Sequence, residues 1–286
     1  MSEDTRTPDT TVDGDPVYVM ARNSAETQRL IDQAAFREPL TRRLFEDAGI
    51  APGMRVLDLG SGAGDVAFLA AEMVGPTGRV LGVDTDPEVL RTARARAEAA
   101  GLDHVDFTVG DLRTVDPGER FDAVIGRFVL MYLADPADGL RRVARHLAPG
   151  GTLALMEVNW RPESMMAFPS TPLWEQLWTW MCETVEHAGV EKNMGFKLHH
   201  AFTEAGLPRP RSTLQAAIAD GDDTDAHLYA AHTLRGLMPL MLQYGVATEE
   251  EVGIDSLARR LQAETRAAGS ILKITDVVGA YTRLPG

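Results

Sequence analysis

The chain has 286 residues, of which 44% are hydrophobic and 24% are charged, a composition typical of a globular protein. The formal net charge of −14 argues against a nucleic-acid partner and against an anionic membrane surface, since both are negatively charged, and favours a small-molecule partner. A single cysteine, Cys182, excludes an intramolecular disulfide bond and fits a reducing compartment. No secretory signal and no apolar run of roughly 18 residues is present, so we expect a cytoplasmic location.

The first half of the chain predicts alternating helices and strands. Residues 1–16 are polar and acidic and are expected to form a disordered tail, and Ser24 can cap a helix over 24–48 that is interrupted near Pro39. Short apolar runs then alternate with amphipathic segments, which indicates right-handed βαβ units and a parallel sheet covered on both faces. The predicted strands are 54–59, 78–84, 104–111, 121–127 and 151–158, with helices after the glycines that follow 59, over 86–101 and over 135–151.

The pattern changes after residue 158. Residues 160–206 are predicted to be helical, and one helix there begins at Thr171 and Pro172 and ends at Gly189. A sixth strand is predicted at 211–218, two helices near 223–243 and 249–267, and a last strand within 271–284. We therefore expect a core of residues 17–158 and 207–286, with a helical lid inserted at 159–206.

A glycine-rich segment, VLDLGSGAGD (Val56–Asp65), joins the first predicted strand to a helix. Ligands of doubly wound sheets lie outside the carboxyl ends of the strands, where glycines allow close approach to the backbone. The spacing here is G-x-G-x-G, and Asp65 occupies the third glycine position of the G-x-G-x-x-G fingerprint. The loop therefore argues against a nicotinamide or flavin cofactor.

Carboxylates stand at the ends of three consecutive predicted strands. Asp58 precedes the glycines, Asp84 ends the second strand, and Asp111 follows the third. A carboxylate at the Asp84 position can accept both hydroxyl groups of a ribose, and one at Asp111 can accept an adenine amino group. Each aspartate alone could be a surface or capping residue, but the set of three favours a nucleoside-containing ligand.

With these segments the chain resembles the class I methyltransferases that use S-adenosylmethionine. VLDLGSGAGD, VLGVDTDPEVL and VGDL look like their first three motifs, and FDAVIGRFVLMYLADP and LRRVARHLAPGGTLALMEV resemble their fourth- and fifth-strand segments. More loosely, the remainder resembles a bacterial small-molecule, natural-product subgroup. The resemblance implies an α/β fold, a doubly wound Rossmann-like seven-stranded sheet, mostly parallel with the last strand antiparallel, plus the helical lid.

The resemblance also implies a cofactor, S-adenosylmethionine, with S-adenosylhomocysteine as the product and no metal ion. The residues it assigns to the cofactor follow the molecule from its methionine end to its adenine. They are Gly60, Ser61 and Gly62 along the methionine part, Asp58 orienting that loop, Arg127 or Phe128 offering a carbonyl group to the ammonium group, Asp84 with Thr85 at the ribose, Asp111 and Leu112 at the adenine, and Tyr18 and Arg22 closing the methionine end.

The sequence excludes some classes of methyl acceptor. GRFVL follows the fourth strand, where enzymes that methylate the amino groups of bases carry an Asn/Asp-Pro-Pro-aromatic motif, so nucleic acid is not the expected substrate. An apolar stripe on the 172–188 helix packs on the core or on another subunit, or forms a lid over an apolar acceptor, and both interpretations can hold at once. On the second interpretation the acceptor pocket consists of Tyr132, Trp160, Trp174, Trp178, Met181 and His232.

The candidate catalytic bases are Glu157, at the end of the fifth strand, and His199 and His200, in the segment KLHHAF. Each could instead be a structural or surface residue. The prediction is a methyltransferase acting on oxygen, carbon or nitrogen of a small, largely apolar molecule, and the resemblance implies that this molecule is a secondary metabolite. The alternatives are an enzyme of this fold that binds the cofactor but does not methylate, or a non-catalytic partner subunit. The apolar helices at 172–188 and 226–244 leave a homodimer open.

Overall fold

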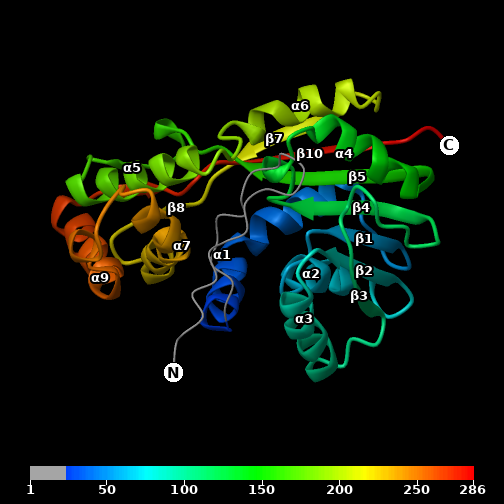
Figure 1. Ribbon diagram of the computed structural model, residues 1–286, viewed down its shortest axis with the longest axis horizontal. Coiled ribbons are helices and arrows are strands. Elements are labelled where there is room, and N and C mark those ends of the chain that lie inside the picture. The colour runs from blue at the N-terminus through cyan, green and yellow to red at the C-terminus, as the bar shows by residue number, and fades with distance from the viewer. Residues whose placement is uncertain (1–23) are drawn as a thin grey trace.

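The computed structural model describes residues 24–286, with side chains from residue 34 onward. Its centre is a seven-stranded sheet in the order β3-β2-β1-β4-β5-β10-β7 (Figure 1). The expected tail at 1–16 and the candidate residues Tyr18 and Arg22 lie outside the described residues. The strands of this sheet are β1 (Arg55–Leu59), β2 (Arg79–Asp84), β3 (Val105–Val109), β4 (Phe121–Arg127), β5 (Leu147–Val158), β7 (Arg211–Gln215) and β10 (Val277–Arg283).

Strand direction agrees with the predicted fold class. β1 pairs in parallel with β2 and β4, and the parallel pairing continues to β3 and β5. β10 runs antiparallel to both of its neighbours, β5 and β7. The prediction of a mostly parallel, doubly wound sheet whose last strand is antiparallel is therefore confirmed.

Helices cover both faces of the sheet. α1 contacts β5 and β10, α2 contacts β1, β2 and β3, and α3 contacts β3, while α6 packs on β5, β10 and α4 (Figure 1). Pro39 lies within α1 but does not interrupt it, so the expected break is not present. These helices are α1 (Ser24–Ala48), α2 (Asp65–Val74), α3 (Pro87–Ala99), α4 (Pro136–Val143) and α6 (Met194–Glu204).

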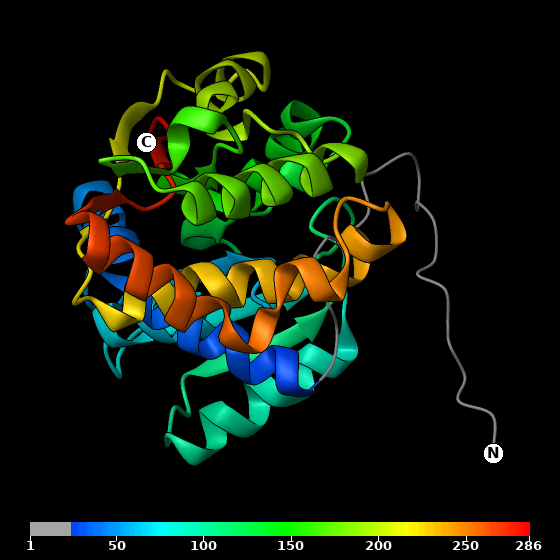
Figure 2. The ribbon, with the colours of Figure 1, turned by 90° about the vertical axis from the view of Figure 1, so that its left-hand side faces the viewer.

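A second group of helices lies beside the sheet. α5, α7 and α9 pack on one another, and α7 and α9 run side by side in Figure 2. A small three-stranded sheet, β6-β9-β8, accompanies them. The elements of this group are β6 (Met166–Phe168), α5 (Pro172–His187), β8 (Ile218–Ala219), α7 (Thr224–Gln243), α8 (Glu249–Val252), α9 (Ile254–Ala268) and β9 (Ile271–Lys273).

The packing differs from the expected boundaries of the lid at 159–206. α6 lies within that range but belongs to the sheet layers, because Leu198, Ala201 and Phe202 are buried where α6 meets β5 and β10. α7 and α9 lie outside the range but pack on α5. α5 and α7 thus pack against each other within one chain, and a homodimer stays a prediction.

Arg37 joins α1 to the helical group. Its side chain is 2% exposed, and it donates hydrogen bonds to Tyr229 Oη on α7 (2.9 and 2.6 Å) and to the carbonyl of Thr275 (2.9 Å). Because the substitution leaves this buried carbonyl without its donor, we expect Arg37→Met to lower the free energy of unfolding by about 1 to 3 kcal/mol. Urea titration checks this, with Arg43→Met as the control on the same helix, since the Arg43 side chain is exposed. Equal midpoints for the two variants would contradict the prediction.

Candidate functional site

The glycine loop between β1 and α2 depends on left-handed backbone conformations. Gly60, Gly62 and Gly64 have φ values of +60°, +53° and +95°, which residues with a side chain rarely adopt. The Ser61 amide donates to the carbonyl of Val83 at 2.9 Å, which anchors the loop to β2. A Cβ on Gly62 would meet nothing within 4 Å, so the loop presents backbone to open space there.

Asp58 is a buried carboxylate at the end of β1. It is 1% exposed, and no described side chain donates a hydrogen bond to either of its carboxylate oxygens. Burial raises the pKa of Asp58 well above its usual range, against the attraction of Arg127 on β4 and the amide of Ala67. A buried carboxylate in this state favours a cationic donor as its partner. The ammonium group of an amino acid moiety is such a donor, so Asp58 fits the methionine end of S-adenosylmethionine.

Arg127 lies at the end of β4, and its side chain contacts α1. Its Nη1 atom donates to Thr41 Oγ1 at 3.0 Å, and burial lowers the pKa of its guanidinium. Arg127 also lines a cavity of about 270 Å³ together with Asp65 and Arg96. Asp65, the residue at the third glycine position, accepts a bond from Arg96 Nη2 of α3 at 2.8 Å. Its carboxylate therefore holds α2 to α3, a contact that the sequence analysis did not anticipate.

Asp84 connects the end of β2 to the glycine loop. Its Oδ2 atom accepts the amide of Gly62 at 2.9 Å, and its Oδ1 atom accepts the amide of Asp86 at 3.0 Å. The carboxylate is half-buried, while the neighbouring Thr85 is exposed. The geometry places Asp84 beside the open face of Gly62, as a ribose-binding carboxylate requires.

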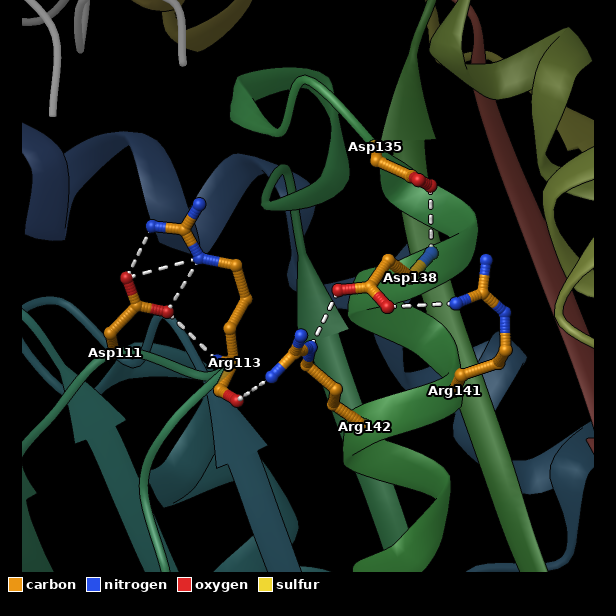
Figure 3. Close-up of polar contacts among 6 residues, drawn as sticks. All are labelled: Asp111, Arg113, Asp135, Asp138, Arg141 and Arg142. Atoms are coloured by element: carbon orange, nitrogen blue, oxygen red, sulfur yellow. Dashed lines mark hydrogen bonds and ion pairs between the residues drawn. The ribbon is translucent and has the colours of Figure 1, made fainter. Parts of the chain in front are cut away.

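Asp111 lies in a network of ion pairs (Figure 3). Its Oδ1 atom accepts the backbone amide of Arg113 at 2.8 Å and the Nε atom of Arg113 at 2.9 Å. Hydrogen bonding from the Arg113 side chain lowers the pKa of Asp111. Arg142 of α4 in turn donates to the carbonyl of Arg113 at 3.4 Å, and it pairs with Asp138.

The Arg113 contact was not anticipated, although the sequence Asp-Leu-Arg places the two side chains two residues apart. Asp111 is ionised and half-buried, and it stands next to Leu112, which packs against the core. The adenine contact expected of Asp111 would have to share the carboxylate with Arg113.

Phe128 follows β4 in a left-handed conformation. Its φ of +60° is the only positive value among the non-glycine residues that the structure describes. A non-glycine residue in this conformation typically costs on the order of 1 to 3 kcal/mol and clusters at functional sites. Its amide donates to the carbonyl of Met156 on β5 at 2.8 Å. The chain thus turns sharply beside the glycine loop.

Glu157 lies under this turn. It is 1% exposed, and its Oε1 atom accepts the amides of Val129 (2.9 Å) and Leu130 (2.7 Å). Burial raises the pKa of Glu157 to about 8, although the bonds from the turn act in the opposite direction. Its Oε2 atom has no hydrogen-bond partner among the described residues.

His199 and His200 do not join Glu157. Both are exposed on α6, and His200 Nε2 lies 3.1 Å from Glu204 Oε1 on the same helix. α6 turns its apolar side to the sheet, which directs both histidines to solvent. The structure therefore does not bring these two candidate bases together with Glu157, and a catalytic role for them stays a prediction. Across residues 24–286, no group of three or more His, Cys, Asp or Glu side chains is arranged to hold a metal ion.

The predicted acceptor pocket is largely hydrophobic core. Trp174, Trp178 and Met181 are buried, and Trp178 stacks on Trp160 with ring centroids 5.4 Å apart. Trp178 Nε1 donates to the carbonyl of Arg161 at 2.7 Å. The apolar stripe of α5 therefore packs inside the molecule, so the alternative of core packing holds. Tyr132 and His232 are half-buried, on the turn after β4 and on α7.

This packing predicts the effect of Trp174→Ala. The side chain is 1% exposed, so removing it leaves a cavity, and we expect the free energy of unfolding to fall by about 3 kcal/mol. Gln176→Ala is the control, because Gln176 is exposed on the same helix. Denaturant titration of both variants measures the difference. If Trp174 were a lid residue, its replacement would leave stability intact and change only the binding of the acceptor.

Comparisons with known proteins agree with this geometry. A family model described as a methyltransferase domain matches residues 50–206. Aklanonic acid methyltransferase DauC from Streptomyces sp. (strain C5) is 36% identical over 141 residues, 48% of this chain and 64% of that protein. The 2-phytyl-1,4-naphtoquinone methyltransferase of Synechococcus elongatus is 32% identical over 190 residues, 65% of this chain and 78% of that protein. The chain thus spans slightly less than two thirds of the aklanonic acid enzyme.

The fold has counterparts among solved structures. The YcgJ protein of Bacillus subtilis is 17% identical and has a TM-score of 0.54, and the match covers 88% of this chain and 99% of that one. At this level of identity the likeness concerns the fold alone.

Proposed function

Since this chain belongs to the methyltransferase-domain family, we propose that it transfers the methyl group of S-adenosylmethionine to oxygen, carbon or nitrogen of a small, largely apolar organic molecule. The single observation that carries the proposal is Asp58, a buried carboxylate near the end of β1 to which no described side chain donates a hydrogen bond, beside glycines that leave the backbone open. A cationic amino acid moiety satisfies this carboxylate, and the sulfonium cofactor brings one. The single cysteine fits a cytoplasmic enzyme.

Different residues of the site would contact different parts of the cofactor. Asp58 would hold the ammonium group, Gly60 to Gly62 would border the methionine chain, and Asp84 would accept the ribose hydroxyl groups. Asp111 and Leu112 would lie against the adenine. Bound there, the cofactor supplies an electrophilic methyl group on a positively charged sulfur.

The protein would then align the acceptor with the methyl group and exclude water from the site. The acceptor atom must approach the methyl carbon in line with the breaking carbon–sulfur bond, whose electron pair passes to the sulfur. A base is needed only where the acceptor must lose a proton. The half-buried Tyr132 and His232 are the remaining members of the expected acceptor pocket.

Two observations support an apolar, small-molecule acceptor. The relatives named above act on aklanonic acid and on 2-phytyl-1,4-naphtoquinone. The net charge of −14 disfavours polyanions such as nucleic acids.

Among the helices of residues 24–286, none is long and apolar enough to cross a bilayer.

The test is turnover. Purified protein is incubated with S-adenosylmethionine and a panel of polycyclic aromatic acids and reduced naphthoquinones, and S-adenosylhomocysteine and methylated products are followed by mass spectrometry. Formation of both supports the proposal. Conversion of a substrate without loss of the cofactor's methyl group would instead indicate a non-methylating enzyme of this fold. Cofactor binding without turnover of any acceptor would favour a partner subunit.

A further inference from the structure

The turn after β4 is strained, and one side chain holds it. Phe128 has a φ of +60°, and the next two amides, of Val129 and Leu130, both donate to Glu157 Oε1. Both hydrogen bonds are buried, so Glu157 supplies the acceptor that keeps these amides satisfied. We call residues 128–130 the β4 turn.

The β4 turn packs closely against the glycine loop. A Cβ on Gly60 would lie 2.9 Å from Val129 Cγ2, closer than real Cβ contacts allow. The Val129 side chain is buried against the loop, so its position and that of the Gly60 backbone depend on each other. A chain of contacts therefore runs from Glu157 on β5, through the β4 turn, to the loop that borders the methionine end.

We propose that Glu157 is a positioning residue, which fixes the β4 turn and through Val129 the glycine loop, and that it does not take the acceptor's proton. The inference rests on the proposed function for its consequence, cofactor affinity. Glu157 is 1% exposed, and two backbone amides donate to its Oε1 atom, so the turn holds the carboxyl group in place; its Oε2 atom is buried and has no hydrogen-bond partner among the described residues.

Two substitutions separate the two roles. Gln keeps an oxygen that can accept both amides but cannot serve as a base, whereas Met removes the acceptor. Asp122 provides a matched control, because its Oδ2 atom accepts the backbone amide of Arg55 at 2.8 Å at the far end of β4. Asp122→Met also removes a carboxylate that accepts a backbone amide, away from the glycine loop.

The experiment measures amide hydrogen exchange of Val129 and Leu130 by NMR in the cofactor-free protein, and the Kd for S-adenosylhomocysteine by calorimetry. Glu157→Met is expected to speed exchange of both amides at least tenfold and to raise the Kd at least tenfold. Glu157→Gln should stay within about threefold of the wild-type protein in both, and Asp122→Met should alter neither.

Three results would overturn the inference. They are unchanged exchange and Kd in Glu157→Met; loss of turnover by 100-fold or more in Glu157→Gln with exchange and Kd intact, the mark of a base; and, if Glu157→Met does not fold, an unchanged Kd in Val129→Ala, which keeps both amides but removes the contact with Gly60. If the wild-type protein binds no S-adenosylhomocysteine, the proposed function fails, and the exchange data still judge the role of Glu157 in holding the turn.

Discussion

Asp58→Asn is expected to weaken S-adenosylmethionine binding by a factor of about 10 to 100. The substitution keeps the shape of the side chain but removes the negative charge that would meet the cofactor's ammonium group, and a charge-assisted hydrogen bond contributes about 1.5 to 3 kcal/mol. Calorimetric titration of the wild-type protein and the variant gives the two Kd values.

The same substitution should stabilise the cofactor-free protein. Burial raises the pKa of Asp58, so its ionisation costs folding free energy near neutral pH, and the amide has no such cost. Asp122→Asn, on β4 at the opposite end of the sheet, is the control and should leave binding unchanged. Equal Kd values for Asp58→Asn and the wild-type protein would show that this carboxylate does not hold the ammonium group.

Glu157 is expected to make the protein less stable as pH rises from about 4.5 to about 8. Its pKa is 4.5 when unperturbed and is raised to about 8 by burial. Between these values the unfolded chain has lost the proton while the folded chain retains it, so stability falls with pH and levels off above the folded-state pKa. The whole change amounts to about 5 kcal/mol at most.

Glu157→Gln isolates this contribution. The amide does not titrate, so the loss of stability between pH 5 and pH 8 should be smaller in the variant than in the wild-type protein. Urea titrations at several pH values measure it, and Glu163→Gln serves as the control because Glu163 is exposed. Parallel stability curves for Glu157→Gln and the wild-type protein would contradict a raised pKa at this position.

The sheet was predictable because its signal is local. The strands β1, β2 and β4 are short, mostly apolar segments, and the spacing of Gly60, Gly62 and Gly64 predicts a loop that approaches a ligand closely. The carboxylates at Asp58 and Asp84 follow from strand ends, which topology brings to one edge of a parallel sheet. These features need no knowledge of distant contacts.

The remainder depends on partners far apart in the chain. Periodicity reveals that α5 has an apolar stripe, but not that α7 and α9 cover it, so Trp174 could be taken for either core or lid. Glu157 was a candidate base because it ends the fifth predicted strand, and the backbone amides that donate to it leave no mark in the sequence. His199 and His200 are exposed because α6 turns its apolar side chains toward the sheet. The sequence of α6 mixes polar and apolar residues, so its pattern does not predict which side of the helix faces the sheet.

The central claim is that the β1, β2 and β3 ends form a cofactor site, and titration with S-adenosylhomocysteine tests it most directly. We expect the wild-type protein to bind one equivalent per chain with a Kd on the order of micromolar, about −8 kcal/mol. Asp84→Ala, which removes the carboxylate that accepts the Gly62 amide, should bind at least tenfold more weakly. No binding to folded wild-type protein, or equal binding by Asp84→Ala, would contradict the account.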